Sequence, residues 1–264
     1  VNIYLAWVPR ENIITTNLWS SELSKLTANA FLAQRISSIN SLSELCEHTG
    51  ANIDEVAKAI GMDSRIGPSF LKTSVGFGGS CFQKDILNLV YIARSLELNI
   101  IADYWEQILI VNKHQRDRFS EKIISTIEKE SLINNILILG WSFKKNTNDT
   151  RESAAIYVAN NLLAKKIEMS VFDPQVNNMQ IQNDLKSLNS DYIENSVNLV
   201  KDIYSEISKS NIIVIITEWD EFVSYDWEYI FQKMKKPAYI FDGRNILDRE
   251  IMQEIGFLYF GIGK

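Results

Sequence analysis

The sequence is poor in the residues on which several classes of protein depend. It has two cysteines, Cys46 and Cys81, in 264 residues. This argues against a disulfide framework and is typical of a reducing compartment, so we expect a cytoplasmic protein. Its two histidines, His48 and His114, lie in polar helical stretches with no second ligand at metal spacing. We therefore predict no metal site and see no basis for a Ser/His/Asp triad.

The sequence also lacks an excess of positive charge and long apolar runs. The formal net charge is −6 and the pI is near 5.1, which argues against a nucleic-acid-binding surface. No apolar run approaches the roughly 20 residues that a membrane helix needs. Hydrophobic residues make up 46% and charged residues 23%, as in ordinary globular proteins. The length suggests two units of the usual ~100–200 residues each.

Glycine is concentrated at one place. Residues 76–85 read GFGGSCFQKD, with three glycines in four positions, followed by a predicted helix over residues 82–96. Ser80 or Cys81 would stand at the helix N-cap, where a thiol ionises more readily than a free one. Asp85 lies one turn further on the same face. The alternative, a helix capped by Ser80 with Cys81 merely buried, has equal support from the local pattern.

A long helix is predicted over residues 18–48. Thr15, Thr16 or Asn17 would cap it, no proline interrupts it, and Gly50 would end it. Some 30 residues at 1.5 Å each would span about 45 Å, a length typical of a scaffold or a subunit interface. Its apolar positions, which include Leu23, Leu26, Ala30, Ile36, Ile39, Leu42 and Leu45, broadly follow a 3.6-residue period, and Cys46 is interpreted as packing beside them.

The pattern changes from helical to alternating near residue 131. Before it, further helices are expected at 54–60, 82–96 and 101–129. After it, strands are expected at 135–140, 168–172, 212–216 and 238–241, with a helix over 152–165. This predicts a mostly α central domain followed by an α/β Rossmann-like domain with a parallel sheet. Residues 175–200 are polar and asparagine-rich and are interpreted as a variable surface region.

The ends of the chain complete the expected domain organisation. Residues 1–5 read as the end of a strand or a linker, and Val1 is not methionine, so we expect the chain to start inside a larger protein. The predicted domains are residues 1–10 as the remnant of a preceding domain or linker, 11–130 as the helical domain, and 131–264 as the α/β domain.

Three further polar groups could carry chemistry. Lys25 and Asn29 lie one helical turn apart, although a solvated face is the default interpretation. Residues 143–153 follow the first predicted strand, at the edge where open parallel sheets bind ligands, and Lys144, Lys145 and Arg151 in them suit an anion such as a diphosphate. An ordinary charged loop with Thr150 capping a helix fits equally well. Arg244, in a turn after a later strand, would reach the same edge.

Four stretches together resemble a known family. They are residues 21–31 (SELSKLTANAF), 76–85, 143–153 (FKKNTNDTRES) and 241–244 (FDGR). In order and spacing they resemble the nucleotide-sugar dehydrogenases, and within them the animal-like UDP-glucose 6-dehydrogenases. The resemblance covers nearly the whole chain, with residues 175–200 the poorest match.

The resemblance implies a reaction and catalytic residues. The family oxidises the C6 alcohol of a nucleotide sugar, UDP-glucose in this type, to a carboxylate with two NAD⁺ and one water. Cys81 is then the nucleophile, forming a thiohemiacetal and, after oxidation, a thioester that water hydrolyses. Lys25 would stabilise oxyanion charge and assist proton transfer, Asn29 would position substrate and water, and Asp85 would assist hydrolysis or orient Lys25.

The resemblance also implies binding residues. Arg65 would reach the substrate of a partner subunit, in a homo-oligomer built on the long helix. The substrate set is Lys25, Asn29, Arg65, Lys72, Phe77, Gly78, Phe143, Lys144 and Arg244. The cofactor set, for NAD, is Cys81, Phe82, Gln83, Lys84 and Arg151.

One part of the family pattern is missing from the sequence. No G-x-G-x-x-G dinucleotide fingerprint is present, so we expect that this polypeptide alone does not turn over. Three alternatives stay open: a dehydrogenase for another nucleotide sugar such as UDP-N-acetylmannosamine or GDP-mannose, a non-catalytic sugar-nucleotide-binding and dimerisation module, and a β-hydroxyacid dehydrogenase. The cysteine loop and the second α/β domain count against the last.

Overall fold

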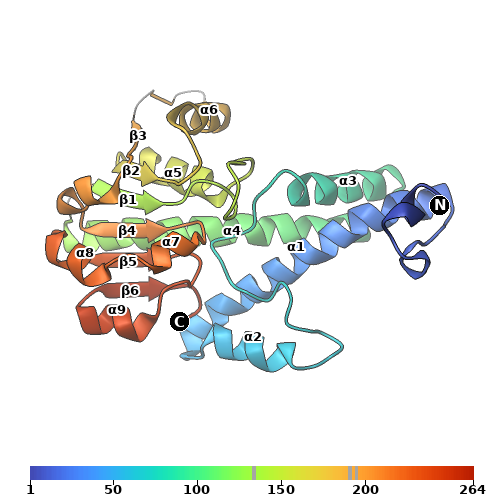
Figure 1. The fold of residues 1–264 in the computed structure, drawn as a ribbon, viewed down its shortest axis with the longest axis horizontal. Helices are drawn as coiled ribbons and strands as arrows, with labels where there is room; N and C mark the ends of the chain where they lie inside the picture. Colours follow the sequence, from blue (N-terminus) through green and yellow to red (C-terminus); the bar gives the residue numbers. More distant parts are fainter. Residues whose placement is uncertain (133–134, 190–191, 194–195) are drawn as a thin grey trace.

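The structure is a computed structural model that describes residues 1–132, 135–189, 192–193 and 196–264 (Figure 1). The first half is helical: η1 (Tyr4–Ala6), η2 (Arg10–Asn12), α1 (Leu18–Thr49), α2 (Ile53–Gly61), α3 (Phe82–Ser95) and α4 (Asn99–Glu130). The second half alternates: β1 (Asn135–Leu139), α5 (Ala154–Ala164), β2 (Glu168–Phe172), α6 (Asn178–Leu188), β3 (Val197–Leu199), η3 (Ile203–Ser205), η4 (Ile207–Lys209), β4 (Ile212–Ile215), α7 (Asp220–Val223), α8 (Trp227–Lys233), β5 (Tyr239–Asp242), α9 (Arg249–Ile255) and β6 (Leu258–Gly261).

Two helices of 32 residues each, α1 and α4, form the frame of the first half. At 1.5 Å per residue each is about 48 Å long. Asn17 caps α1 by accepting a hydrogen bond from the Ser20 amide at 2.8 Å, and Gly50 ends it with a φ of +78°. Both predictions are confirmed. Helix α3 packs against both long helices, and α3, α1 and the first half of α4 run side by side away from the sheet (Figure 1).

The inner face of α1 differs from the predicted apolar stripe. Leu23, Leu42 and Leu45 are 49%, 38% and 59% exposed, whereas the buried face consists largely of small residues: Ala30, Ala33, Ser37, Ile39, Asn40, Ser43 and Cys46. Small side chains let α3 and α4 approach closely, which leaves the leucines for the outer face. Cys46 is buried against the side chains of α2, so its interpretation as packing is confirmed.

The second half is a six-stranded sheet with strand order β3-β2-β1-β4-β5-β6. Every pairing is parallel, so the predicted α/β domain with a parallel sheet is confirmed. Because the strand order reverses between β1 and β4, the loops after these strands diverge and leave a crevice at their carboxyl ends. The loop after β1 is the predicted anion-binding stretch.

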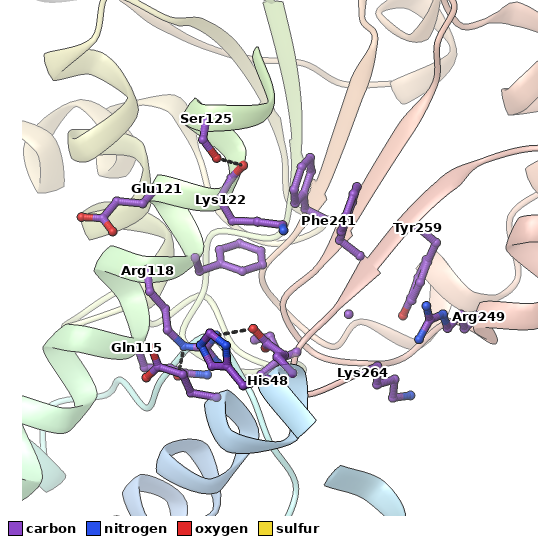
Figure 2. A pocket seen from close by; sticks show the side chains of 16 residues that line it. His48, Gln115, Arg118, Glu121, Lys122, Ser125, Phe241, Arg249, Tyr259 and Lys264 are labelled. Carbon is purple, nitrogen blue, oxygen red and sulfur yellow. Dashed lines mark hydrogen bonds and ion pairs between the residues drawn. The ribbon is translucent and has the colours of Figure 1, made fainter. Parts of the chain in front are cut away.

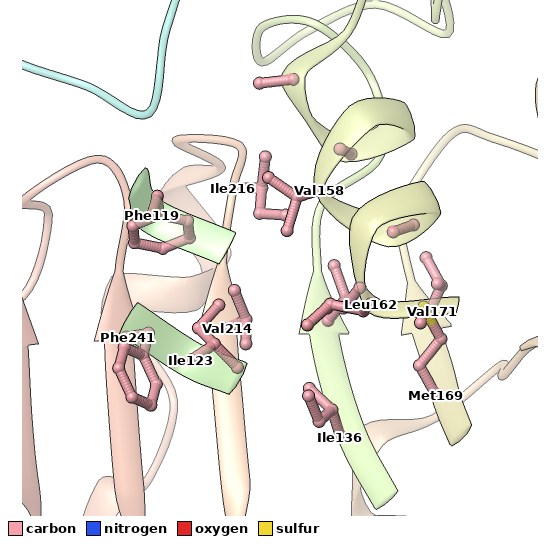
Figure 3. Packing of buried hydrophobic residues seen from close by; sticks show 14 of the residues in the cluster. Phe119, Ile123, Ile136, Val158, Leu162, Met169, Val171, Val214, Ile216 and Phe241 are labelled. Carbon is pink, nitrogen blue, oxygen red and sulfur yellow. The ribbon is translucent and has the colours of Figure 1, made fainter. Parts of the chain in front are cut away.

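The core lies on both faces of the sheet. On one face, residues of β1, β4 and β5 pack against α5 and the second half of α4, including Ile136, Val214, Phe241, Phe119 and Ile123 (Figure 3). The other face packs against α7, α8 and α9. Helix α4 therefore contributes to both halves, and it places the helical half at the carboxyl edge of the sheet.

Three stretches differ from the sequence-based expectations. Residues 175–200, interpreted as a variable surface region, contain α6 and the edge strand β3, which were not expected there; residues 190–191 and 194–195 lie outside the described part. Strand β6 was not expected, because its four residues are too short to show a period. Residues 1–5 form no strand and enter a short 3-10 turn instead, so the strand interpretation is wrong and the linker interpretation stays a prediction.

The described residues contain neither a helix suited to span a membrane nor a group of side chains suited to hold a metal ion. None of the helices there combines the length and apolar character needed to cross a membrane. Within the same residues, no group of three or more His, Cys, Asp or Glu side chains is arranged to hold a metal ion.

Candidate active site

The cysteine loop, residues 76–81, is held between the two halves of the chain by its backbone. Asn112 of α4 accepts from the Phe77 amide at 2.9 Å and donates to the Phe77 carbonyl at 3.1 Å. On the other side, the Gly79 amide donates to the Arg151 carbonyl at 2.9 Å. The loop is thereby fixed to the helical half and to the predicted anion-binding loop at the same time.

Glycine is required where the loop meets the sheet domain. A Cβ atom at Gly78 would lie 2.4 Å from the carbonyl oxygen of Glu152, closer than any real contact. Gly79 has a φ of +86°, in the left-handed region that other residues avoid, and its face lies against the Phe143 ring. The two glycines therefore allow the backbone approach that brings the cysteine to this crevice.

Cys81 is the N-cap residue of α3, and its side chain is exposed. The alternative of a merely buried cysteine is therefore wrong. Its side chain makes no capping hydrogen bond, and the Ser80 hydroxyl lies 3.8 Å from its sulfur atom. An exposed thiol at the positive end of a 14-residue helix is in the environment expected of a reactive cysteine.

Lys25, Asn29 and Asp85 meet one turn from Cys81. Asp85 is 1% exposed and accepts hydrogen bonds from the Lys25 ammonium and, at 2.5 Å, from the Asn29 amide. Burial alone raises the pKa of the Asp85 carboxyl, but these two hydrogen bonds outweigh it and hold that pKa below its usual value. The Asp85 carboxylate in turn raises the pKa of Lys25, with a smaller contribution from Cys81. The Lys25 side chain is still 59% exposed, so the face of α1 is solvated as the default interpretation expects, but both polar ends are bound to the buried Asp85, and their catalytic role stays a prediction.

A cavity of about 430 Å³ lies between the cysteine loop and the sheet edge. It gathers six of the predicted substrate residues and one predicted cofactor residue from both halves of the chain. Its lining is Ile36, Phe70, Lys72, Thr73, Ser74, Phe77, Gly78, Phe82, Phe143, Lys144, Glu218 and Arg244. Aromatic walls with two lysines and an arginine suit a base or sugar joined to phosphates.

Arg244 is held rigidly at the wall of this cavity. Its Nε donates to the Ile216 carbonyl at 2.6 Å and its Nη2 to the Phe143 carbonyl at 3.0 Å. Glu218, which follows β4, lies 3.2 Å from the same Nε. Backbone carbonyls thus fix the orientation of the guanidinium at the cavity wall, beside the Glu218 carboxylate.

A second cavity, of about 470 Å³, lies on the other side of Cys81. Its lining is Ser80, Gln83, Lys84, Leu87, Asn88, Arg151 and Glu152, which includes three of the predicted cofactor residues. Arg151 pairs with Asp149 through two hydrogen bonds of 2.9 and 2.6 Å. Ser80 lines this cavity and Phe82 lines the first, so the two sequence neighbours of Cys81 belong to different cavities, while Cys81 itself lines neither.

Some predicted residues lie elsewhere. Arg65 is in an exposed turn and pairs with Asp63 at 2.6 Å, so its role toward a partner subunit stays a prediction. Lys145 pairs with Asp220 at 2.6 Å and does not line the 430 Å³ cavity, unlike Lys144. Thr150 does not cap α5; Ser153 does, by accepting from the Ala155 amide.

The sequence-based analysis missed the polar residues that hold the loop. Asn112, Gln115 and Arg116 of α4 are buried, although they belong to an otherwise apolar face with Ile108 and Phe119. Ile108, Asn112, Gln115 and Phe119 follow one another at intervals of four, three and four residues, so the sequence already placed them on one helical face. Polar side chains on a buried helical face mark groups that serve another segment.

A further cavity of about 600 Å³ contains none of the predicted site residues (Figure 2). It lies where the end of α1, the middle of α4 and β6 meet, and its lining mixes acidic and basic residues. Several of these are already paired: Arg118 with Glu47 at 2.7 Å, and Lys264 with Asp54 at 2.7 Å. We interpret it as a polar joint between the two halves.

The chain thus combines a helical unit, a parallel α/β unit and an exposed cysteine at a helix N-cap. Two family models match it. Residues 19–114 match the central domain of the UDP-glucose/GDP-mannose dehydrogenase family, and residues 137–249 match its UDP binding domain. The chain belongs to this family, and the resemblance read from its motifs is confirmed.

Individual relatives point the same way. The chain is 54% identical to UDP-glucose 6-dehydrogenase of Drosophila melanogaster, over 99% of this chain and 56% of that protein. It is 54% identical to the Caenorhabditis elegans UDP-glucose 6-dehydrogenase, over 100% of this chain and 55% of that protein. The chain thus spans about half the length of the curated relatives it matches.

Solved structures agree on the fold. A UDP-glucose dehydrogenase from Pyrobaculum islandicum superposes with a TM-score of 0.74 at 28% identity, over 92% of this chain and 51% of that chain. A UDP-D-ManNAc dehydrogenase from Pyrococcus horikoshii superposes with a TM-score of 0.80 at 25% identity, over 99% of this chain and 56% of that chain.

The Asp85 cluster predicts a pH dependence of stability. Because the folded-state pKa of Asp85 lies below the usual 3.8, the stability from its ionised form is present above that value. It is lost as the pH falls through the lowered pKa. Asp85→Asn should lower the free energy of unfolding by about 1–3 kcal/mol near pH 7. The difference from the wild type should shrink below about pH 4, as measured by denaturant unfolding.

Asp103→Asn is the matched control. Asp103 is an exposed aspartate that pairs with Arg94 at 3.3 Å, so this change should alter stability by less than about 0.5 kcal/mol at either pH. An Asp85→Asn deficit that does not change between pH 7 and pH 3 would contradict the assignment of ionised Asp85 to the cluster.

Proposed function

We propose that this chain is the substrate-binding and thiol-bearing part of a UDP-glucose 6-dehydrogenase. The observation that carries the proposal is that the sequence neighbours of Cys81 line two different cavities. Phe77, Gly78 and Phe82 line the cavity with the predicted sugar-nucleotide residues, and Ser80, Gln83 and Lys84 line the one with the predicted cofactor residues. The identity of 54% to UDP-glucose 6-dehydrogenases of two animals supports this substrate over other nucleotide sugars.

Cys81 is the proposed nucleophile. Loss of one hydride from the C6 alcohol leaves an aldehyde, to which the thiolate adds to form a thiohemiacetal. Loss of a second hydride from the thiohemiacetal gives a thioester, and water hydrolyses it to the carboxylate and releases the Cys81 thiolate. Lys25 donates a hydrogen bond to the oxyanion, and its ammonium is kept protonated by Asp85. Asn29, which donates to the same carboxylate, positions substrate and water. Lys72, Phe77, Gly78, Phe143, Lys144 and Arg244 hold the nucleotide sugar.

NAD is the proposed cofactor, and the 470 Å³ cavity fits part of it. NAD supplies the hydride acceptor when bound. Lys84 and Arg151 provide positive charge for its phosphates, and the amides at the start of α3 lie beside it. Phe82, which lines the other cavity, would separate cofactor from nucleotide. Since the chain carries no dinucleotide fingerprint, we propose that these residues complete a site on another domain.

The substrate cavity predicts a difference between two neighbouring lysines. Lys144→Ala should weaken UDP-glucose binding to the 264-residue chain about tenfold or more, because it removes a cation from the cavity wall. Lys145→Ala, the matched control, should change the dissociation constant by less than about twofold, because Lys145 pairs with Asp220 instead. Isothermal titration calorimetry measures both.

The same titration separates the alternatives. Tighter binding of UDP-N-acetylmannosamine or GDP-mannose than of UDP-glucose would overturn the proposed substrate. Equal effects of the two lysine changes would contradict the assignment of the cavity. Steady NADH formation by the 264-residue chain itself would show that it is more than a binding module.

The covalent mechanism predicts the loss of turnover without Cys81. Cys81→Ser, in a polypeptide that joins this chain to a dinucleotide-binding domain, should lower kcat by about 1,000-fold or more because no thioester forms. Cys46→Ser is the control, since Cys46 is buried in packing far from both cavities. A coupled NADH assay measures both, and near-normal turnover of Cys81→Ser would refute the covalent role.

We propose a homodimer built on the long helix. The supporting observation is a large set of exposed apolar side chains on α1 and the helices beside it: Leu18, Trp19, Leu23, Phe31, Leu87, Tyr91, Ile92, Ile100, Ile101, Tyr104 and Ile110. So much exposed apolar surface is typical of an interface.

The free thiols of Cys46 and Cys81 are in keeping with a reducing compartment, and we propose a cytoplasmic location.

The dimer predicts that a charge on the outer face of α1 produces monomers. Leu23→Glu should raise the dimer dissociation constant at least about tenfold, because it buries a charge in the interface. Met179→Glu is the control: Met179 is 71% exposed on α6, outside this surface. Sedimentation velocity measures both, and an unchanged Leu23→Glu dimer would exclude this interface.

A further inference from the structure

A buried arginine lies directly behind the cysteine loop. Arg116 of α4 is 5% exposed, and its guanidinium carbon lies 3.7 Å from the centroid of the Tyr157 ring. Its Nε and Nη1 find no hydrogen-bond partner among the described residues. Burial lowers the pKa of Arg116, but an arginine remains charged in proteins. This buried charge takes no part in the proposed chemistry.

The charge is balanced through Tyr157. The Tyr157 hydroxyl donates a hydrogen bond to Glu152 Oε2. Burial, together with this bond, raises the pKa of Tyr157 to about 12, so the hydroxyl stays protonated and donates at neutral pH. Arg116 above the ring and Glu152 at its hydroxyl therefore form a neutral three-residue cluster between α4 and α5.

Both ends of the cluster touch the cysteine loop. A Cβ at Gly76 would lie 3.2 Å from Arg116 Cγ, so the arginine stem packs against the start of the loop. The Glu152 carbonyl faces Gly78 closely, as described above. Glu152 also has a φ of +56°, which a residue with a Cβ adopts only when its surroundings hold it there. The bond from its side chain to Tyr157 is such a restraint.

We propose that Arg116, Tyr157 and Glu152 are positioning residues that set where the cysteine loop docks against residues 149–153. The inference rests on the proposed function, because it is through this docking that Phe77, Gly78 and Phe143 form one cavity and that Cys81 stands beside it. A buried charge contributes little net stability compared with apolar packing. Its value here lies in fixing one geometry of the two loops.

The test is Tyr157→Phe in the 264-residue chain, which keeps the ring under Arg116 and removes only the hydroxyl. The Gly79 amide, bonded to the Arg151 carbonyl, should exchange its hydrogen about tenfold faster, as expected when local opening costs one hydrogen bond less. The Ile213 amide in the central strand β4 is the internal reference and should stay within about twofold. If Tyr157 contributed only to overall stability, the change would make hydrogen exchange at both amides equally faster, because both would then exchange through global unfolding.

The matched control is Tyr225→Phe. Tyr225 donates to Glu221 at 2.7 Å, the same kind of bond far from the loop, so neither amide should change. The Tyr157→Phe chain should also bind UDP-glucose at least about threefold more weakly while remaining folded. Unchanged Gly79 exchange, or equal acceleration of Gly79 and Ile213, would overturn the inference, and so would unchanged binding alongside faster Gly79 exchange.

The two proposals fail in different ways. If the wild-type chain does not bind UDP-glucose, the proposed function falls, whereas Gly79 exchange still tests the docking because it requires no ligand. If the wild-type chain binds UDP-glucose but Tyr157→Phe leaves the hydrogen exchange of the Gly79 amide unchanged, only the positioning role is overturned.

Discussion

The contact between Gly78 and the Glu152 carbonyl is the constraint on which the rest of the site depends. It is a backbone-to-backbone approach that any Cβ would prevent. Through it the cysteine loop, which belongs to the helical half, becomes one wall of a cavity whose other wall is the sheet edge. Asn112 holds the loop from the opposite side through the backbone N–H and C=O of Phe77. The loop is thus fixed without any regular secondary structure of its own.

Asp85 performs the equivalent task for Lys25 and Asn29, the side chains proposed to be catalytic. It is buried at the first turn of α3, and it collects Lys25 and Asn29 from α1, some 60 residues earlier in the chain. A buried carboxylate needs such partners to stay ionised, and the partners in turn acquire a fixed position near Cys81. The same interaction therefore satisfies a buried charge and orients the groups proposed to act on the substrate.

The topology of the sheet explains why the second half supplies the anion-binding residues. Strand order reverses between β1 and β4, so Phe143 and Lys144 after β1 and Glu218 after β4 border one crevice. Helix α4 packs its second half against this sheet and its middle against the cysteine loop. One long helix thereby aligns the two walls of the cavity, and the Arg116 cluster lies at the point where it does so.

The sequence by itself determined the elements that have a strong local signal. The caps at Asn17 and Gly50, the buried runs of β1 and β4, and the glycine-rich approach to Cys81 are local features, governed by φ preferences, periodicity and capping. Tertiary structure decided what local rules cannot encode: that Cys81 is exposed, that Lys144 rather than Lys145 lines the cavity, and that Leu23, Leu42 and Leu45 of α1 face outward. These depend on which surfaces meet at long range. The short strands β3 and β6 likewise exist only because a neighbouring strand completes their hydrogen bonds.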